Sequence, residues 1–351
     1  MSNLSRNRKE EYAHREKRVV TDINRIRAGV VGVGHMGSYH VGVYSELFNV
    51  EFVGVADTDI NKAENIARKY NTVPYQDYKE LFGKIDVVSI AVPTELHYEV
   101  AADFLNKGVH VLLEKPITKN LDQARKLFEI AKEKGVVLNI GHVERFNGAV
   151  QELKNIVSNP IFIESRRLGP YVERVKDDDV VLDLMIHDID IILNLVDSKV
   201  KEVSAKGVSV FSNHEDLANI QISFENGCIA NITASRATQQ KIRTMAVTQK
   251  DAYIFLDFTD QDIHIHRQAS SEHILTKEEL RYKQESFIER IFVHKDNPLK
   301  LEIKHLIECA LNNANHHAEN SVSIEKELQS LELALTVIDT FKKNRIEFKE
   351  S

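Results

Sequence analysis

A glycine-rich turn at residues 32–37 restricts the fold of this chain more than any other pattern. An apolar run leads into Gly32-x-Gly34-x-x-Gly37, and a segment suited to a helix, residues 38–48, follows. In a strand–turn–helix unit, Gly32 makes the tight turn, Gly34 lets the backbone approach a pyrophosphate, and Gly37 lets the helix pack on the strand. We therefore expect a dinucleotide here, with its pyrophosphate at the helix N-terminus.

The second apolar run indicates which dinucleotide binds. Residues 50–56 end at Asp57, which follows Gly37 by 20 positions. A carboxylate at this place binds the ribose hydroxyls of the adenosine half. The next residues are Thr58 and Asp59, so a 2′-phosphate would meet two carboxylates and no cation. The sequence therefore favours NAD over NADP.

The pattern after Asp57 predicts an α/β architecture. Strand-like segments (85–92, 109–113 and 136–140) alternate with helix-like ones (60–70, 93–105 and 121–134). This alternation predicts a doubly wound parallel sheet, a Rossmann domain, whose ligands lie at the carboxyl ends of the strands. Asp57, Thr94, Lys115 and His142 all fall at such ends.

The pattern changes after about residue 150. Seven segments are strand-like, namely 162–168, 200–210, 217–224, 228–235, 241–249, 251–257 and 262–266, and three are helix-like, namely 181–196, 299–312 and 324–343. They predict a C-terminal α+β domain with a large, mostly antiparallel open sheet. We expect a charged N-terminal extension at 1–26, an NAD-binding domain at 27–148, and a domain for substrate binding and oligomerisation at 149–351.

Charge and composition exclude several classes of function. The formal net charge is −7, which argues against nucleic acid as a partner because binding phosphates needs a basic face. No apolar run of about 18 residues is present, and residues 1–27 lack the apolar core of a secretory signal, so we expect no membrane partner. The two cysteines, Cys228 and Cys309, are far apart, which fits a reducing, cytoplasmic setting.

One lysine is a candidate for chemistry. Lys115 stands between Glu114 and Pro116 where a strand ends, and a following proline favours extended or turn geometry. Held there, its side chain would point over the cofactor crevice, as a hydrogen-bond donor or as a base. An ordinary surface lysine is the alternative.

The apolar helix at 181–196 carries a second group of candidates. Asp183 and His187 are four residues apart and share a face, with Asp190 near it. A carboxylate can fix the tautomer of a histidine and support its protonated form, as an acid/base pair requires. A structural Asp–His pair is one alternative. Metal ligation by His187, Asp188 and Asp190, in a metal-dependent hydrolase, is another, although the chain offers no clear matching ligand set.

Basic residues gather in three groups that could receive a phosphorylated substrate or could decorate the surface of the sheet. They are Arg145, then Arg166, Arg167 and Arg174, then Arg236, Lys241 and Arg243.

Together these motifs resemble the Gfo/Idh/MocA family of NAD(P)-dependent sugar oxidoreductases. The glycine turn, Asp57, Glu114-Lys115-Pro116 and Asp183-x-x-x-His187 occur in the family's order, and the resemblance covers about residues 27–345. Within the family, segments 141–147, 167–171 and 234–236 are most similar to those of UDP-N-acetylglucosamine 3-dehydrogenases, which oxidise the 3-hydroxyl to a ketone that a partner aminotransferase then aminates for lipid A biosynthesis.

The resemblance implies roles for individual residues. It implies catalysis by Lys115, Asp183 and His187, with His187 oriented by Asp183, and a Lys–Pro peptide bond that is often cis. The cofactor-binding residues would be Gly32, Gly34, His35, Met36, Gly37, Asp57, Pro93, Thr94, His97, Glu114 and Lys115. The substrate-binding residues would be Lys115, His142, Arg145, Asn147, Arg167, Tyr171, His187 and Arg236, with Arg167 and Arg236 near the diphosphate of a UDP-sugar. No metal is expected.

Two departures and one alternative accompany the resemblance. Gly148 follows Asn147 where a proline is common, and Met185 replaces a glycine found in many relatives, so we expect Met185 to narrow the substrate pocket. The family also implies a homodimer or homotetramer built on the open face of the sheet. Another sugar or inositol dehydrogenase of the family is an alternative, as is a non-catalytic sensor of NAD or a nucleotide sugar on the same fold.

Overall fold

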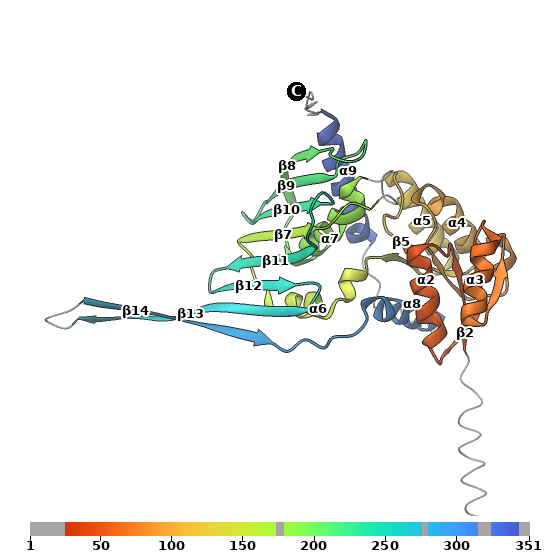
Figure 1. Cartoon of the computed structure of the whole chain (residues 1–351), viewed down its shortest axis with the longest axis horizontal. Helices are drawn as coiled ribbons and strands as arrows, with labels where there is room; N and C mark the ends of the chain where they lie inside the picture. Colours follow the sequence, from red (N-terminus) through yellow and green to blue (C-terminus); the bar gives the residue numbers. More distant parts are fainter. Residues whose placement is uncertain (1–24, 173–178, 276–279, 315–323, 344–351) are drawn as a thin grey trace, which may run out of the picture.

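The computed structural model describes residues 25–172, 179–275, 280–314 and 324–343, which form two sheets with their helices (Figure 1). The first sheet has six strands in the order β3-β2-β1-β4-β5-β6, and every neighbouring pair is parallel. The predicted doubly wound sheet is confirmed, and its order reverses between β1 and β4, where such sheets bind ligands. Its strands are β1 (Ile26–Val31), β2 (Val50–Ala56), β3 (Val73–Tyr75), β4 (Val87–Ile90), β5 (His110–Glu114) and β6 (Leu138–Gly141).

Helices cover both faces of this sheet. The segments between its strands form α2 (His35–Glu46), α3 (Ile60–Tyr70), the short η1 (Tyr78–Leu81), α4 (Thr94–Asn106) and α5 (Leu121–Lys134). Local signals set several of the helix ends. The Asp59 side chain caps the start of α3 and Asn120 that of α5, while Gly135, at φ +64°, ends α5 in a left-handed conformation.

The second sheet has eight strands in the order β14-β13-β12-β11-β7-β10-β9-β8. All its pairs are antiparallel except β7 with β10, so the mostly antiparallel sheet is confirmed. Its strands are β7 (Phe162–Leu168), β8 (Val200–Val208), β9 (Leu217–Phe224), β10 (Ile229–Ser235), β11 (Ile242–Gln249), β12 (Ala252–Asp257), β13 (Asp262–Leu275) and β14 (Leu280–Ile291). Figure 1 shows β13 and β14 running out beyond the other strands. The sequence predicted only the first part of β13 and missed β14.

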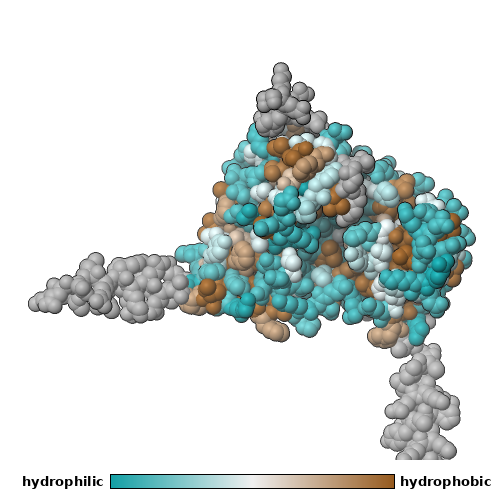
Figure 2. Space-filling view, viewed as in Figure 1, coloured by the Kyte–Doolittle hydropathy of each residue, from teal (hydrophilic) through white to brown (hydrophobic). Residues whose placement is uncertain are grey.

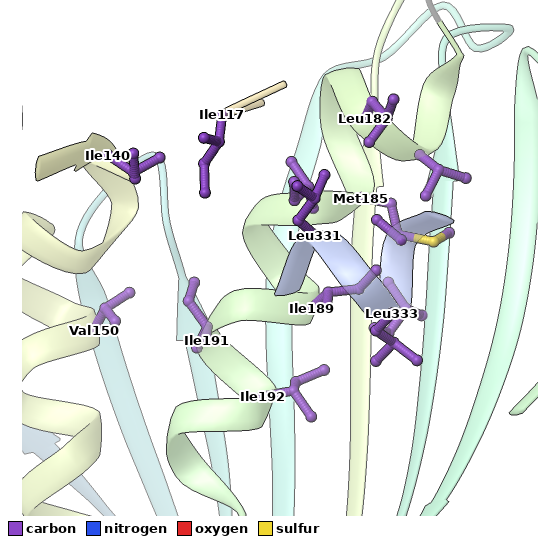
Figure 3. Close-up of a cluster of buried hydrophobic side chains, with 14 of the residues drawn as sticks. Ile117, Ile140, Val150, Leu182, Met185, Ile189, Ile191, Ile192, Leu331 and Leu333 are labelled. Atoms are coloured by element: carbon purple, nitrogen blue, oxygen red, sulfur yellow. The ribbon is translucent and has the colours of Figure 1, made fainter. Parts of the chain in front are cut away.

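A helical segment packs on one face of the second sheet and carries two of the candidate residues. It begins as a π-helical turn, η4 (Val181–Met185), and continues as α7 (Ile186–Leu195). In Figure 3 the side chains of Met185, Ile189 and Leu333 come together between this segment and α9 (Ile324–Lys343). Met185 is 0% exposed and belongs to the core. The expectation that it narrows the substrate pocket is therefore wrong.

The connections between the two sheets cross more than once. The short η2 (Val143–Phe146) and α6 (Gly148–Ile156) lead from the first sheet to the second, and α8 (Pro298–Ala314) comes after β14. Leu299, Ile303, Leu306 and Ile307 of α8 share a core with strands and helices of the first sheet. The division into domains at residue 148 stays a prediction, and α8 lies against the first sheet although it comes late in the chain.

The surface fits the mixed composition. Figure 2 shows one face on which hydrophilic residues predominate and apolar ones are scattered. Among the described residues, no helix combines the length and the apolar character that a membrane span needs.

Candidate active site

The glycine turn has the geometry that a dinucleotide requires. Gly32 has φ +82°, and a Cβ there would lie 2.5 Å from the Ala91 carbonyl oxygen. A Cβ on Gly37 would lie 1.8 Å from the Gly32 carbonyl oxygen, so neither position accepts a side chain. A Cβ on Gly34 would meet nothing within 4 Å. The turn is therefore closed on the protein side and open where a pyrophosphate would approach.

The first turn of α2 has free capacity for an anion. Gly34 is its N-cap and offers no side-chain cap, so the first N–H groups have no side-chain acceptor from that residue. His35 is exposed and Met36 half-buried in this same turn. Both lie where the sequence predicted cofactor contacts, and these contacts stay a prediction.

Asp57 lies beside the glycine turn at the end of β2. Its carboxylate accepts hydrogen bonds from the backbone N–H of Val33 and of Asp59, each 2.9 Å long. The side chain is half-buried, so it keeps an accessible side for a ribose hydroxyl. With Asp59 close by, the position fits NAD better than a 2′-phosphate.

The loops that follow β4 and β5 also lie at this end of the first sheet. Pro93 caps α4 and is exposed, and the half-buried Thr94 begins that helix. His97 is buried instead, with Nε2 2.9 Å from the Val92 carbonyl oxygen and Nδ1 2.8 Å from that of Pro116. His97 therefore joins two loops at the cofactor edge and positions them, rather than reaching the cofactor itself.

Glu114 also faces inward. Its Oε1 lies 2.9 Å from Nε2 of His40 on α2, and both side chains are buried. Burial raises the pKa of Glu114, but the hydrogen bond to His40 together with the charges of His40 and Lys115 lowers it overall. The expected contact between Glu114 and the cofactor does not fit this orientation. No pattern in the sequence marks His40, whose partner lies 74 residues away.

Lys115 projects from the first sheet to the helical segment on the second. Its Nζ donates to the Asp183 carbonyl oxygen at 2.5 Å and lies 3.4 Å from Asp183 Oδ1. The Lys115–Pro116 peptide bond is cis, as the resemblance implied. Asp183 lies in the π-helical turn, a feature frequent at functional sites. The two candidates, 68 residues apart, thus meet in one place.

His187 lies one turn beyond Asp183 and is half-buried. Its Nδ1 has no hydrogen-bond partner among the described residues, so the expected Asp183–His187 hydrogen bond is absent there and Asp183 contacts Lys115 instead. Burial, followed by the positive charges of Lys115 and Arg167, lowers the pKa of His187 well below its ordinary value of 6.5. A neutral imidazole at neutral pH can accept a proton.

His142 and Tyr171 are two further residues that the sequence predicted to contact substrate. His142 is buried at the end of β6, and its Nδ1 has no partner among the residues described. Tyr171 is half-buried, and its ring is tilted against that of Phe211 with the ring centres 5.3 Å apart. Their predicted contacts with substrate stay predictions.

The three arginines expected to bind substrate are held in ion pairs inside the protein. Arg145 forms a two-pronged pair with Asp190, at 2.6 and 2.7 Å, and a second pair with Glu327 of α9. Burial opposes its charge, yet these carboxylates raise its pKa above the ordinary value. Arg145 therefore ties η2 to α7 and α9, which corrects the expectation that it contacts substrate.

Arg167 is enclosed more completely, with a side chain 2% exposed compared with 11% for Arg145. Its Nε donates to Asp188 Oδ2 at 2.7 Å and its Nη1 to Glu144 Oε1 at 2.8 Å. Because both carboxylates already bind it, Arg167 does not offer its guanidinium to a diphosphate, contrary to the expectation.

Arg236 and Asn147 also serve the fold. Arg236, 2% exposed, donates to Asp216 Oδ1 at 2.7 Å and to Ser212 Oγ at 3.1 Å. Asn147 is buried, caps α6 through Ala149 N–H, and donates to the Phe258 carbonyl oxygen at 3.0 Å. Neither arrangement supports the expected contact with substrate.

The ion pairs of Asp188 and Asp190 argue against the metal site that was the alternative for these residues. Asp188 faces Arg167 and Ser165, whereas Asp190 faces Arg145. The two carboxylates therefore point to different partners and do not converge with His187, as a metal site would require.

Comparison with known proteins agrees with this geometry. Residues 26–142 match the family described as "Oxidoreductase family, NAD-binding Rossmann fold", and residues 146–254 match the "GFO/IDH/MocA C-terminal domain". The chain belongs to the Gfo/Idh/MocA family. It is an NAD-dependent dehydrogenase, and the open glycine turn and Asp57 fit that cofactor.

Individual relatives of this Gfo/Idh/MocA chain differ in their named substrates. UDP-N-acetylglucosamine 3-dehydrogenase of Acidithiobacillus ferrooxidans is 35% identical over 246 residues, which span 70% of this chain and 78% of the relative. A solved structure of that enzyme superposes with a TM-score of 0.79 at 31% identity, covering 90% of this chain and 97% of the other. The scyllo-inositol 2-dehydrogenase (NAD(+)) of Bacillus subtilis is 28% identical over 61% of this chain and 68% of its own length.

One residue of this Gfo/Idh/MocA site was noticed in the sequence but not chosen. Arg243 lies opposite Arg167 in the pairing of β11 with β7. Its side chain is 34% exposed, compared with 2% for Arg167. The residue type and the strand were apparent from sequence, but the strand register that brings it to the site was not.

Proposed function

We propose that this protein oxidises the 3-hydroxyl of UDP-N-acetylglucosamine to a ketone with NAD as the oxidant. The observation that carries the proposal is the meeting of Lys115 and Asp183 across the two sheets, with His187 one turn away. The similarity to UDP-N-acetylglucosamine 3-dehydrogenase supports the choice of substrate.

The residues divide the chemistry between them. His187, neutral because its pKa is lowered, accepts the proton of the reacting hydroxyl. Lys115 donates a hydrogen bond to the same oxygen, whose negative charge grows in the transition state. Asp183 holds the Lys115 ammonium through its carbonyl oxygen and carboxylate. Bound NAD supplies the acceptor for the two electrons that leave the substrate carbon.

The test is product identification. Purified protein is incubated with NAD and UDP-N-acetylglucosamine, NADH is followed by absorbance, and the sugar is analysed by mass spectrometry. We expect a product two mass units lighter, as loss of two hydrogens demands. An aminotransferase with an amino donor should increase the yield by consuming the ketone, and we propose such an enzyme as the functional partner. No NADH and no ketone, even with that coupling, would refute the proposed substrate.

A second candidate is an inositol or other unphosphorylated sugar as substrate. The observation that favours it is the enclosure of Arg167 and Arg236, the two arginines expected near a diphosphate, in internal ion pairs. The similarity to scyllo-inositol 2-dehydrogenase points the same way. NADH formation with inositols but not with UDP-sugars would establish this alternative. Binding of NAD without turnover of either class would indicate a sensor.

A homo-oligomer is also proposed. Helices η4, α7 and α9 pack on one face of the eight-stranded sheet, and on strands β12 and β14 the side chains of Tyr253 and Ile288 are 44% and 60% exposed. A second copy would cover such apolar side chains. Light scattering after size-exclusion chromatography should give a mass that is a multiple of 40.1 kDa, and a monomer would contradict the proposal.

A further inference from the structure

Three cations and two carboxylates lie together where β7 ends and β11 begins, beside η2 and α7. Arg167 and Arg243 are direct cross-strand neighbours on β7 and β11, and Lys241 precedes Arg243 by two residues. The carboxylates are Asp188 and Glu144. Like charges placed opposite each other in an antiparallel pair are destabilising unless something neutralises them.

The two carboxylates satisfy Arg167 first. Asp188 binds Arg167 through both of its oxygens, at 2.7 and 3.2 Å. Glu144 Oε1 lies 2.8 Å from Arg167 Nη1 but 3.7 Å from Arg243 Nη1. At that longer distance Arg243 has an ion pair without a hydrogen bond. Within the described part of the chain, the Arg243 side chain donates no hydrogen bond and neither does that of the exposed Lys241, so both can bind a further acceptor.

The positive charges of Arg167 and Arg243 lower the pKa values of neighbouring basic groups. Burial and then Arg167 lower the pKa of Arg243, and Arg243 itself is the largest cause that lowers the pKa of Lys241. Arg243 is also among the charges that lower the pKa of His187. An anion bound between Arg243 and Lys241 would relieve this repulsion, on the side of the site from which Arg243 acts on His187.

We propose that Arg243, assisted by Lys241, binds the phosphates of a nucleoside diphosphate sugar and so decides specificity for phosphorylated over unphosphorylated sugars. The inference rests on the proposed function, since it places the diphosphate beside a sugar held by Lys115 and His187. It assigns to Arg243 the role that the buried Arg167 and Arg236 do not fill. A planar guanidinium can bind a phosphate through two N–H groups, and an ammonium adds a point charge.

The experiment compares Arg243→Gln with three matched variants. Arg243→Lys keeps the charge but loses the two-pronged geometry, Lys241→Gln removes the assisting cation, and Lys250→Gln changes an exposed lysine just beyond the far end of β11. Each variant is assayed for oxidation of UDP-N-acetylglucosamine and for competitive inhibition by UDP. NAD affinity and the thermal midpoint report whether the fold is intact.

We expect Arg243→Gln to raise KM for the UDP-sugar and the inhibition constant of UDP together, by about 10- to 100-fold, with kcat changed much less. Lys241→Gln should raise both by a smaller factor, Arg243→Lys should recover part of the loss, and Lys250→Gln should behave as the wild type. Because a positive charge is lost near His187, the acid limb of the pH profile should also move to higher pH in Arg243→Gln. A purely structural role would not produce this set of results.

The outcomes separate this inference from the proposed function. If the wild type oxidises the UDP-sugar and folded Arg243→Gln has unchanged constants for both ligands, the inference is overturned and the function stands. If Arg243→Gln does not fold, unchanged constants in Lys241→Gln overturn it in the same way. If the wild type does not oxidise UDP-N-acetylglucosamine but binds UDP, and Arg243→Gln weakens that binding, the phosphate site stands and only the identity of the sugar falls. If the wild type does not bind UDP at all, the inference is overturned.

Discussion

Two edges face each other across the active site, and they are built by opposite means. On the edge of the first sheet, the chain makes the site mostly from backbone, since Gly32 and Gly37 have no room for a side chain and Gly34 leaves open space. On the edge of the second sheet, the chain makes it from charged side chains, most of which neutralise one another. The glycine turn is determined by residues close to one another in the sequence. The charged cluster is determined by ion pairs between residues that are far apart in the sequence.

The largest expected effect comes from the two residues that bridge these edges. Lys115→Met and His187→Asn should each lower kcat by about 10²- to 10⁴-fold, because they remove the donor and the proton acceptor at the reacting oxygen. NAD binding should change little, since the glycine turn is untouched. Steady-state rates and an NAD titration test this, with the exposed Lys126→Met as the control. Turnover within about tenfold of the wild type in both variants would break the assignment.

The next effect tests whether the second edge uses its buried arginines for stability. Arg145→Met leaves Asp190 and Glu327 buried without their cation, which should cost about 3–5 kcal/mol in the free energy of unfolding. Arg27→Met, which breaks a partly exposed pair with Asp86, should cost about 0–1 kcal/mol. Urea unfolding measures both. A raised KM with unchanged stability in Arg145→Met would return that residue to the substrate site.

A smaller effect separates the two kinds of glycine on the first edge. Gly34→Ala should unfold within about 1 kcal/mol of the wild type, because its Cβ meets no atom within 4 Å, yet NAD affinity should fall about tenfold or more. Gly37→Ala should instead lose about 1–3 kcal/mol of stability, because its Cβ overlaps the Gly32 carbonyl. Isothermal titration and unfolding curves measure the pair. Equal losses of stability would show that the turn is not open at Gly34.

The smallest effect is a displacement of a pH profile. His187 acts as a base only when neutral, and its pKa is held well below 6.5 by burial and by the cations around it. The rate of oxidation, measured as kcat/KM, should therefore stay on its plateau down to pH values below 6.5 and fall only in more acidic buffer. An acid limb centred at or above pH 6.5 would contradict the assignment of His187 as a base whose pKa is lowered.

Much of the fold was accessible from the sequence because its signals are local. The bounds of α3, α5, α9, β7 and β9 were predicted to the residue from periodicity and caps. The strand β14 was missed because charged residues recur through 280–291 and give no clear alternation of apolar and polar positions. The helix α6 was missed because Gly148, a poor helix former, begins it.

In the candidate site, too, features with local sequence signals were predicted and features that depend on distant residues were not. The cofactor turn followed from its motif and from the strand-end rule, whereas the common site of Lys115 and the Asp183 segment was implied by the resemblance to the family. The pairing of Arg145 with Glu327 spans 182 residues, and no pattern in the sequence marks two such groups as partners. Arg243 was passed over for a related reason, since its position beside Arg167 depends on the register of β11 against β7. An arginine in a sequence gives no indication of whether a carboxylate of the same protein already holds it.

The path of α8 has a consequence for dissecting the protein. This helix follows the second sheet in the chain, yet it covers apolar residues of the first, among them Val30, Val41 and Leu112. A fragment that stops near residue 148 would expose these apolar residues to water. A fragment that starts there would contain α8 without the sheet against which its apolar face packs. We therefore expect neither fragment to fold stably alone. A truncated or fused protein that keeps the NAD-binding sheet should also keep residues 298–314.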